Sequence, residues 1–348
     1  MFDIVTFGEA MVRMSPPDFK RLEQTATLDL HIGGAELNVA VGASRFGLKA
    51  AWVSKLPDNP LGRMIANKAR ELGVDISQVI WQKEGRAGLY FLEFGASPRA
   101  SSVLYDRANS SFSSIKPGEL DWQNILKDVK CLHLTGITPA VSESAAAAAM
   151  EALKAAKACG CKVSLDLNYR AKLWSRQKAG KTLSSMMDYV DILITTQGDT
   201  RTILDITADT DEALARILLE RYPFEVVAVS FREGDTVWRC TWSALAQTRD
   251  KTFNTRTFAI DIVDQVGRGD SFAAGFLSGY IGTADVQKAL DYGVAFAALK
   301  HSFPGDFNWC TKSEVEALLA GTCLLYTSDA ADDQWRVLGG GGGGGVGG

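Results

Sequence analysis

The sequence has few of the residues that build metal sites and disulfide frameworks. It contains only three His and six Cys in 348 residues, and no two Cys stand in the C-x-x-C spacing of a zinc or redox motif. Reduced thiols are the expected state of these cysteines, because cytosolic proteins keep such residues unpaired. We therefore expect a cytoplasmic protein.

Long apolar runs and a surplus of positive charge are also missing. No apolar run approaches the roughly 18 residues that a membrane helix needs. The first residues, MFDIVTFGEAMVRM, lack the basic region and apolar core of a signal peptide. Lys and Arg number 37 and Asp and Glu number 41, which gives a net charge of −4. Nucleic acids and anionic membranes attract basic surfaces, so we expect neither as a partner.

The last residues depart from a globular pattern. Residues 339–348 are nearly all Gly, and such a run cannot bury a core. Residues 322–338 interrupt the helical pattern that precedes them. We therefore expect residues 1–321 to form the folded domain and residues 322–348 to be a non-native or disordered Gly-rich tail.

From residue 51 onward, predicted strands alternate with predicted helices. The predicted strands include 51–56, 162–167, 192–195 and 226–231, and the predicted helices include 61–72, 143–159 and 211–221. This order predicts an α/β fold with a mostly parallel sheet that helices cover on both faces. In residues 12–32 and 89–106 strand follows strand, which predicts a small antiparallel flap beside the main sheet.

The segment from Asp264 to Phe276 carries the strongest functional signal. Gly267 and Gly269 bracket a tight turn directly before a helix predicted over 271–280. Free N–H groups at a helix start bind anions, and glycines let a phosphate approach closely. A carboxylate such as Asp270 commonly just caps a helix, but beside a phosphate site it can accept the proton of an alcohol. The segment is neither a Walker A loop nor a dinucleotide fingerprint.

Two motifs resemble the signatures of the ribokinase-like (PfkB) carbohydrate kinases. They are GGAELNVA at residues 33–40 and DQVGRGDSF at residues 264–272. The resemblance extends over about residues 3–320 and implies one kinase domain, a three-layer sandwich around a mostly parallel sheet with a small antiparallel β lid. The motifs FGEAM (7–11), YDR (105–107) and DLNYRAKLW (166–174) most resemble 2-keto-3-deoxygluconate kinases.

The resemblance implies roles for the residues at matching positions. Asp270 would be the catalytic base, and the amides of Gly267, Arg268 and Gly269 would form the anion hole. The residues that would bind the sugar acid are Gly34, Asn38, Tyr90, Tyr105, Arg107, Arg170 and Asp306. Those that would bind ATP are Thr196, Ser230, Arg232 and Gly234. ATP requires Mg²⁺, and many relatives also use K⁺.

Two positions depart from the pattern of this family. Many relatives carry Asn-x-x-Glu after the strand at 192–195, where the Glu helps to organise Mg²⁺ through water. The matching residues here are TQGD at 196–199, so Asp199 would do this with a shorter side chain. Arg268 replaces a residue that is usually small, but the anion hole needs only its amide.

Arg107 and Arg170 both follow predicted strands and stand near aromatic residues. A single Arg is most commonly a surface ion-pair residue, but two together suit a planar carboxylate, which neutral sugars lack. We therefore predict ATP-dependent phosphorylation of the terminal hydroxyl of an acidic keto-sugar, 2-keto-3-deoxy-D-gluconate giving its 6-phosphate. The alternatives are a fructokinase or other neutral-sugar kinase and a non-catalytic sugar-binding protein on this fold. An exposed flap edge would allow subunits to pair, so we expect a homo-oligomer.

Overall fold

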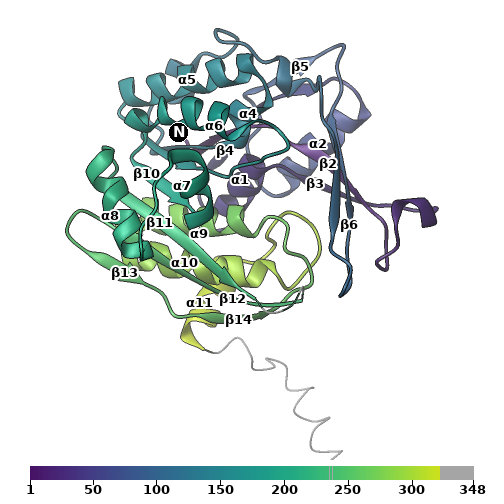
Figure 1. Cartoon of the computed structure of the whole chain (residues 1–348). Helices are drawn as coiled ribbons and strands as arrows, with labels where there is room; N and C mark the ends of the chain where they lie inside the picture. Colours follow the sequence, from purple (N-terminus) through teal and green to yellow (C-terminus); the bar gives the residue numbers. More distant parts are fainter. Residues whose placement is uncertain (235, 237, 322–348) are drawn as a thin grey trace, which may run out of the picture.

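The computed structural model describes residues 1–234, 236 and 238–321 (Figure 1). The predicted tail, 322–348, lies outside the described residues. The main sheet contains β1 (Ile4–Phe7), β4 (Ala50–Pro57), β5 (Val79–Gln82), β8 (Cys131–Thr135), β9 (Lys162–Asp166), β10 (Ile192–Thr195), β11 (Val226–Glu233), β12 (Arg239–Gln247), β13 (Thr252–Asn254) and β14 (Phe258–Asp261). A second sheet contains β2 (Met11–Ser15), β3 (Asp29–Gly33), β6 (Gly88–Glu93) and β7 (Ser102–Asp106).

The helices lie between these strands along the chain. They are α1 (Ala35–Arg45), α2 (Pro60–Glu71), α3 (Trp122–Ile125), α4 (Ile137–Val141), α5 (Glu143–Ala158), α6 (Arg176–Ser184), α7 (Gln197–Leu204), α8 (Asp211–Arg221), α9 (Arg268–Thr283), α10 (Val286–Lys300) and α11 (Lys312–Ala320). Short 3-10 turns occur at Leu22–Gln24, Phe112–Ser114 and Met187–Tyr189. No helix in the described part of the chain is long and apolar enough to cross a membrane.

The main sheet is mostly parallel, as the alternation of strands and helices predicted. Its order is β13-β12-β11-β10-β9-β8-β1-β4-β5, and β14 pairs with β12 beside β13. Every pair from β11 to β5 is parallel, and the pairs that β12 makes with β11, β13 and β14 are antiparallel. The predicted fold class is therefore confirmed.

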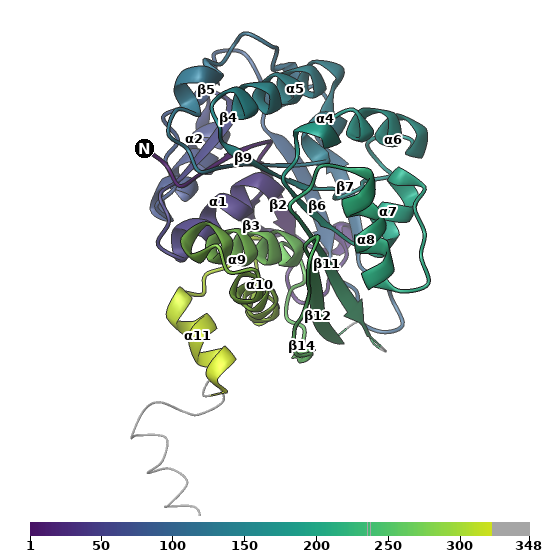
Figure 2. The same cartoon turned by 90° about the vertical axis from the view of Figure 1, so that its left-hand side faces the viewer.

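Helices cover both faces of this sheet because successive side chains of its strands point to opposite sides. Ile4 and Trp52 face one apolar cluster, whereas Val5 and Val53 face another. The first cluster includes residues of α1, α2, α9 and α10, and the second includes residues of α5, α6 and α8. Figure 2 shows these two groups of helices on either side of the sheet. The result is a three-layer sandwich.

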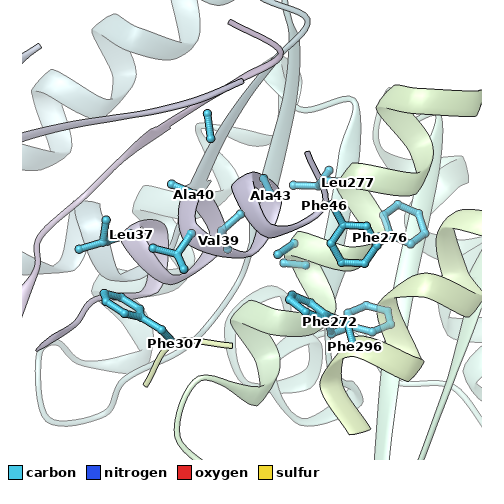
Figure 3. Packing of buried hydrophobic residues seen from close by; sticks show 14 of the residues in the cluster. Leu37, Val39, Ala40, Ala43, Phe46, Phe272, Phe276, Leu277, Phe296 and Phe307 are labelled. Carbon is cyan, nitrogen blue, oxygen red and sulfur yellow. The ribbon is translucent and has the colours of Figure 1, made fainter. Parts of the chain in front are cut away.

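Close packing of α1 against α9 brings the two signature motifs together. A Cβ at Gly42 would lie 2.5 Å from the Cβ of Ala274, so only a glycine lets the helices approach this closely. Phe46 continues the contact, with its ring centroid 4.9 Å from that of Phe296 in α10 (Figure 3). Because α1 and α9 start at the same end of this interface, Asn38 near the start of α1 reaches Asp270 near the start of α9.

The second sheet is the predicted small lid, and its order is β3-β2-β6-β7. The pairs β2–β3 and β6–β7 are antiparallel, and the central pair β2–β6 is parallel. The register aligns Arg13, Tyr90 and Tyr105 across β2, β6 and β7. Arg13 and Tyr90 are buried, so this row faces the body of the protein. Figure 1 shows the lid strands beside the main sheet.

Candidate active site

Side chains with chemical function gather where strands of the main sheet end. Glu9 follows β1, Asp166 ends β9, and Thr196 follows β10. Parallel pairs connect β1, β8, β9 and β10, so these carboxyl ends lie along one edge of the sheet. This is the edge at which doubly wound folds bind ligands. The lid leaves the body at the same edge, because β2 begins two residues after Glu9.

The start of α9 presents the free N–H groups that an anion site needs. Gly267 is the N-cap, with φ at +79°, and a Cβ there would lie 2.0 Å from the carbonyl oxygen of Asp306. Both observations require glycine. Among the described residues, the N–H groups of Arg268, Gly269 and Asp270 have no acceptor, which is the usual condition of a first helical turn. A phosphate group would satisfy these donors.

Asp270 is the third residue of α9, because the helix begins at Arg268 rather than at the predicted residue 271. Gly267 occupies the N-cap position, so Asp270 is not the N-cap residue of this helix. The Asp270 carboxylate is buried and accepts a hydrogen bond from Nδ2 of Asn38 at 2.6 Å. Burial raises its pKa, although Asn38 and nearby cations oppose the shift. A raised pKa makes a carboxylate a better proton acceptor.

Asn38 and Gly34 lie beside Asp270 and are connected to it by hydrogen bonds. The backbone N–H of Gly34 donates to Oδ1 of Asn38 at 3.3 Å, while the amide group of Asn38 holds Asp270. A Cβ at Gly34 would lie 2.2 Å from the carbonyl oxygen of Glu9, so the chain after β1 passes directly over this glycine. The predicted contact of Gly34 and Asn38 with sugar remains a prediction, and the structure gives Asn38 a role in orienting Asp270.

Asp306 joins the lid to the body. Its Oδ1 accepts a hydrogen bond from the hydroxyl of Tyr90 on β6. A Cβ at Gly33 would lie 1.9 Å from the same oxygen, so the end of β3 packs on this carboxyl group. Burial raises the pKa of Asp306 to about 6, against the opposing effects of Arg13 and Tyr90.

Arg107 is held in the lid by a carboxylate. Its Nε lies 2.9 Å from Oε2 of Glu9, and its Nη2 contacts the same oxygen. The Arg107 guanidinium also lies 5.9 Å from the ring centroid of Tyr105, and the ammonium of Lys172 lies 5.8 Å from that ring. Nζ of Lys172 further donates to the carbonyl oxygen of Val103 at 2.7 Å. The chain after β9 therefore meets β7, and two cations flank one tyrosine.

Arg170 lies on the same segment and is exposed, with no side-chain hydrogen bond or ion pair among the described residues. Its charge acts on the buried carboxyl groups of Asp166 and Asp270 and on the half-buried carboxyl group of Asp199. Burial raises the pKa of Asp166 well above its usual range, and repulsion from Asp199 and Asp270 adds to this. An additional cation near these three carboxyl groups would relieve that repulsion.

The residues predicted to bind ATP lie around the next strands. Thr196 is the N-cap of α7 and accepts a hydrogen bond from the backbone N–H of Asp199 at 3.1 Å. Ser230 and Arg232 lie within β11 rather than after it, because pairing with β12 extends this strand to residue 233. Gly234 follows directly. Arg232 is exposed, and its side chain has no hydrogen bond or ion pair with an acceptor in the described part of the chain.

Arg268 supplies more than a backbone amide. Its Nη1 donates to Oε1 of Gln265 at 2.6 Å, and its guanidinium lies 5.7 Å from the ring centroid of Trp242. Burial lowers its pKa to about 10, and the nearby charge of Arg232 acts in the same direction. Its side chain is thus fixed at the edge of the anion site, and it stays cationic at neutral pH.

The residues present fit a nucleotide that carries Mg²⁺. Unpaired N–H groups and arginines match polyphosphate charge, and the repelling carboxyl groups of Asp166 and Asp199 match a cation. No set of three or more His, Cys, Asp or Glu side chains in the described residues could hold a metal alone. Mg²⁺ commonly keeps several waters and binds through one or two carboxylates plus substrate phosphates. A base, an anion site and arginines together suit phosphoryl transfer to an alcohol.

The comparison with protein families agrees with this chemistry. The model described as pfkB family carbohydrate kinase matches residues 1–309. The chain belongs to the PfkB family of carbohydrate kinases.

Similar proteins act on acidic sugars. This PfkB kinase is 40% identical to a 2-dehydro-3-deoxygalactonokinase from Haloferax volcanii, over 92% of this chain and 97% of that protein. It is 39% identical to a 2-dehydro-3-deoxygluconokinase from Thermotoga maritima, whose crystal structure superposes with a TM-score of 0.89 over 92% of this chain and all of that one. A proposed ribokinase II from Escherichia coli, solved with ATP and Mg²⁺, shares 20% identity with a TM-score of 0.82 and covers 92% of this chain and all of that one. This last likeness shows the fold alone.

Three residues of the kinase site were not assigned from the sequence. Glu9 orients Arg107, Lys172 flanks Tyr105, and Arg13 pairs with Asp306. Glu9 lies in the crossing from β1 into the lid, where the position after a strand was the available signal. Arg13 lies inside the lid strand β2, where no local signal marks it. Lys172 belongs to the quoted segment 166–174, but nothing in that segment indicates which lid strand it meets.

Proposed function

We propose that this kinase transfers the γ-phosphoryl group of ATP to the terminal hydroxyl of an acidic keto-sugar, with 2-keto-3-deoxy-D-gluconate as the preferred substrate. One observation carries the proposal: Arg107 and Lys172 flank Tyr105, and Arg170 lies two residues before Lys172. Cations gathered around one aromatic side chain suit a carboxylate that accepts hydrogen bonds from their N–H groups. The similar galactonate and gluconate kinases support this substrate class.

The chain's own residues supply the remaining steps. Asp306, Tyr90 and Gly34 hold the hydroxyl groups of the sugar, and Asn38 aims the carboxylate of Asp270. Asp270 accepts the hydroxyl proton while the sugar oxygen bonds to the γ-phosphorus and the bond to the β-phosphate breaks. The free N–H groups at the start of α9 hold the charge of the transferring group.

The nucleotide binds along Thr196, Ser230, Arg232 and Gly234 in this proposal. Asp199 would hold the Mg²⁺ that accompanies ATP through water, and the cation would shield phosphate charge. K⁺ activation is a separate element of the proposal and rests on the resemblance alone. It is tested by comparing rates in potassium and tetramethylammonium salts. A cytoplasmic location is proposed too, since ATP is a cytoplasmic substrate and the described cysteines form no disulfide.

We also propose a homo-oligomer that pairs through the outer face of the lid. The register aligns Leu30, Met14, Phe91 and Leu104 across all four lid strands. Leu30 is 53% exposed and Leu104 is 60% exposed, so the described residues leave both ends of this apolar row uncovered. Light scattering should give more than one chain per particle, and Leu104→Lys should shift it to one. A monomeric wild type would contradict this part of the proposal.

Release of ADP across a panel of sugars tests the substrate class. The panel holds 2-keto-3-deoxygluconate, 2-keto-3-deoxygalactonate, fructose and ribose, with ATP and Mg²⁺ in excess. We expect the two acids to have kcat/KM values at least tenfold above those of the neutral sugars, and the product phosphate to lie on the terminal carbon. Equal or higher values for fructose would overturn the assignment to an acidic substrate.

A further inference from the structure

A cluster of buried charges lies between the lid and the anion site. Arg13, on the interior lid strand β2, has no exposed surface. Its Nη2 lies 2.7 Å from Oδ2 of Asp264, and its Nη1 lies 3.1 Å from Oδ2 of Asp306. One guanidinium thus bridges two carboxylates that belong to two different loops of the body.

Asp264 holds those two loops together. Its Oδ1 accepts a hydrogen bond from the backbone N–H of Val266, and its Oδ2 accepts one from the backbone N–H of Gly305, both at 2.9 Å. The first loop leads into the anion hole, and the second leads to Asp306. The ammonium of Lys300, on α10, lies 3.4 Å from the carbonyl oxygen of Asp264. A buried carboxylate needs such compensation, and among the described lid residues Arg13 is the one that hydrogen-bonds the Asp264 carboxylate.

We propose that Arg13 is a positioning residue for phosphoryl transfer. Its side chain holds the anion-hole loop and the Asp306 loop in one arrangement relative to the lid. The inference rests on the proposed function, because the roles of these loops do. A guanidinium suits the task, since its planar fork can contact two carboxylates at once, whereas an ammonium is a point charge. The lid that covers the sugar and the loop that holds the phosphate then move as one unit.

The same geometry makes a prediction about pH. The groups that face Asp306 are Arg13 from β2, Tyr90 from β6, Asp264 from its own loop and Lys300 from α10, and His31 from β3 lies beside the neighbouring Gly305. Asp306 accepts hydrogen bonds from sugar hydroxyls as a carboxylate. Loss of the Arg13 charge raises the pKa of Asp306, so the carboxylate protonates at a higher pH. The acid limb of kcat/KM for the sugar therefore moves to higher pH.

The test compares Arg13→Lys and Arg13→Met with the control Arg99→Met. Arg99 also lies in the lid, where its Nη2 donates to the carbonyl oxygens of Phe19 and Phe94, but it does not contact either carboxylate. We expect Arg13→Met to lose roughly 10- to 100-fold in kcat/KM for the sugar, the value of a charged hydrogen bond. Arg13→Lys should lose less kcat/KM. The pH of the acid limb should be lowest in the wild type, higher in Arg13→Lys and highest in Arg13→Met. Arg99→Met should leave the acid limb in place.

The kcat/KM of each variant is compared with that of the wild type on the sugar that the wild type phosphorylates best. Failure of the acidic-sugar assignment therefore does not affect this test. The proposal is wrong if both variants fold and match Arg99→Met in rate and in acid limb. Hydrogen exchange on the wild type gives a second test that needs no variant. Adding sugar should slow exchange in β2 and in residues 264–267 together, and slowing in β2 alone would contradict the coupling.

Discussion

The two halves of the active site differ in how much of their structure exists before ligands bind. On the sugar side, Glu9 holds Arg107, Asn38 holds Asp270, and Tyr90 holds Asp306. On the proposed nucleotide side, the side chain of Arg232 is exposed and has no partner among the described residues. The sugar side is mostly a set of completed contacts, with the exposed Arg170 as its exception, whereas the charge of Arg232 is unpaired.

This difference follows from the chemistry of the two ligands. Sugar hydroxyls are neutral, so they bind well only to donors and acceptors that are already fixed, because fixing them during binding costs entropy. A polyphosphate carries enough charge to order flexible cations around itself. The comparison teaches that selectivity resides in the fixed half and that the open half contributes affinity for any nucleoside triphosphate.

The largest expected effect lies at the junction of the two halves. Asp270→Asn should keep the fold, since Asn is nearly the same size and Gly267, not Asp270, caps the helix. It cannot accept the hydroxyl proton, so kcat should fall by about 10²–10⁴-fold. The measurement is kcat, together with the thermal midpoint and the affinity for ATP. Near-normal kcat in a folded variant would remove Asp270 from the chemistry.

The next effect separates two arginines that serve the same proposed carboxylate. Arg107→Met and Arg170→Met should each raise KM for the acidic sugar by about tenfold or more, with little change for ATP. Arg107→Met should also lose stability, on the order of 3 kcal/mol, because Glu9 is left buried without its partner. Arg170→Met should not, because its side chain is exposed.

Kinetics on both substrates and urea unfolding measure this contrast. A stability loss in both variants, or in neither, would show that the paired Arg107 and the exposed Arg170 do not differ in the way described. A rise of KM for ATP alone in Arg170→Met would move that residue to the nucleotide side.

A smaller expected effect is the dependence of KM for ATP on salt, which tests the exposed charge on the proposed nucleotide side. Exposed charges are screened, with a Debye length of about 10 Å at 0.1 M salt and about 3 Å at 1 M. KM for ATP should therefore rise with ionic strength, while KM for the sugar rises less. Arg232→Ala should reduce the salt dependence for ATP and leave KM for the sugar unchanged. A sugar KM that rises as steeply as that for ATP would contradict the comparison.

The smallest effect concerns the end of the chain. Deletion of residues 322–348 should leave kcat and the thermal midpoint nearly unchanged, because a Gly-rich segment contributes no core. We propose on this basis that residues 1–321 form the folded kinase domain. Loss of folding in the truncated protein would show that the segment is needed.

Local patterns predicted the architecture because its strands are buried on both faces. Continuous apolar runs such as 192–195 and 226–231 mark parallel strands directly, and β10 begins and ends as predicted. The anion loop was also visible, since two glycines before a helix have few other uses. The start of α9 and the end of β11 were misplaced, because turn geometry and pairing with β12 decide them.

The long-range pairs could not be predicted from local patterns. Arg13 and Asp264 are 251 positions apart, and Glu9 and Arg107 are 98 positions apart. No periodicity or composition links such residues, because the fold alone brings them together. The sequence therefore indicated which residues carry charge at the site, and the structure was needed to show which of them are already paired.

The most direct test of the account removes the charge from the substrate instead of the protein. The substrates are 2-keto-3-deoxygluconate and its uncharged carboxamide, and the enzymes are the wild type and the double variant Arg107→Met, Arg170→Met. In the wild type, the amide should lose at least tenfold in kcat/KM, and in the double variant the two substrates should differ by less than threefold. An equal loss in both enzymes would contradict recognition of the carboxylate by these arginines.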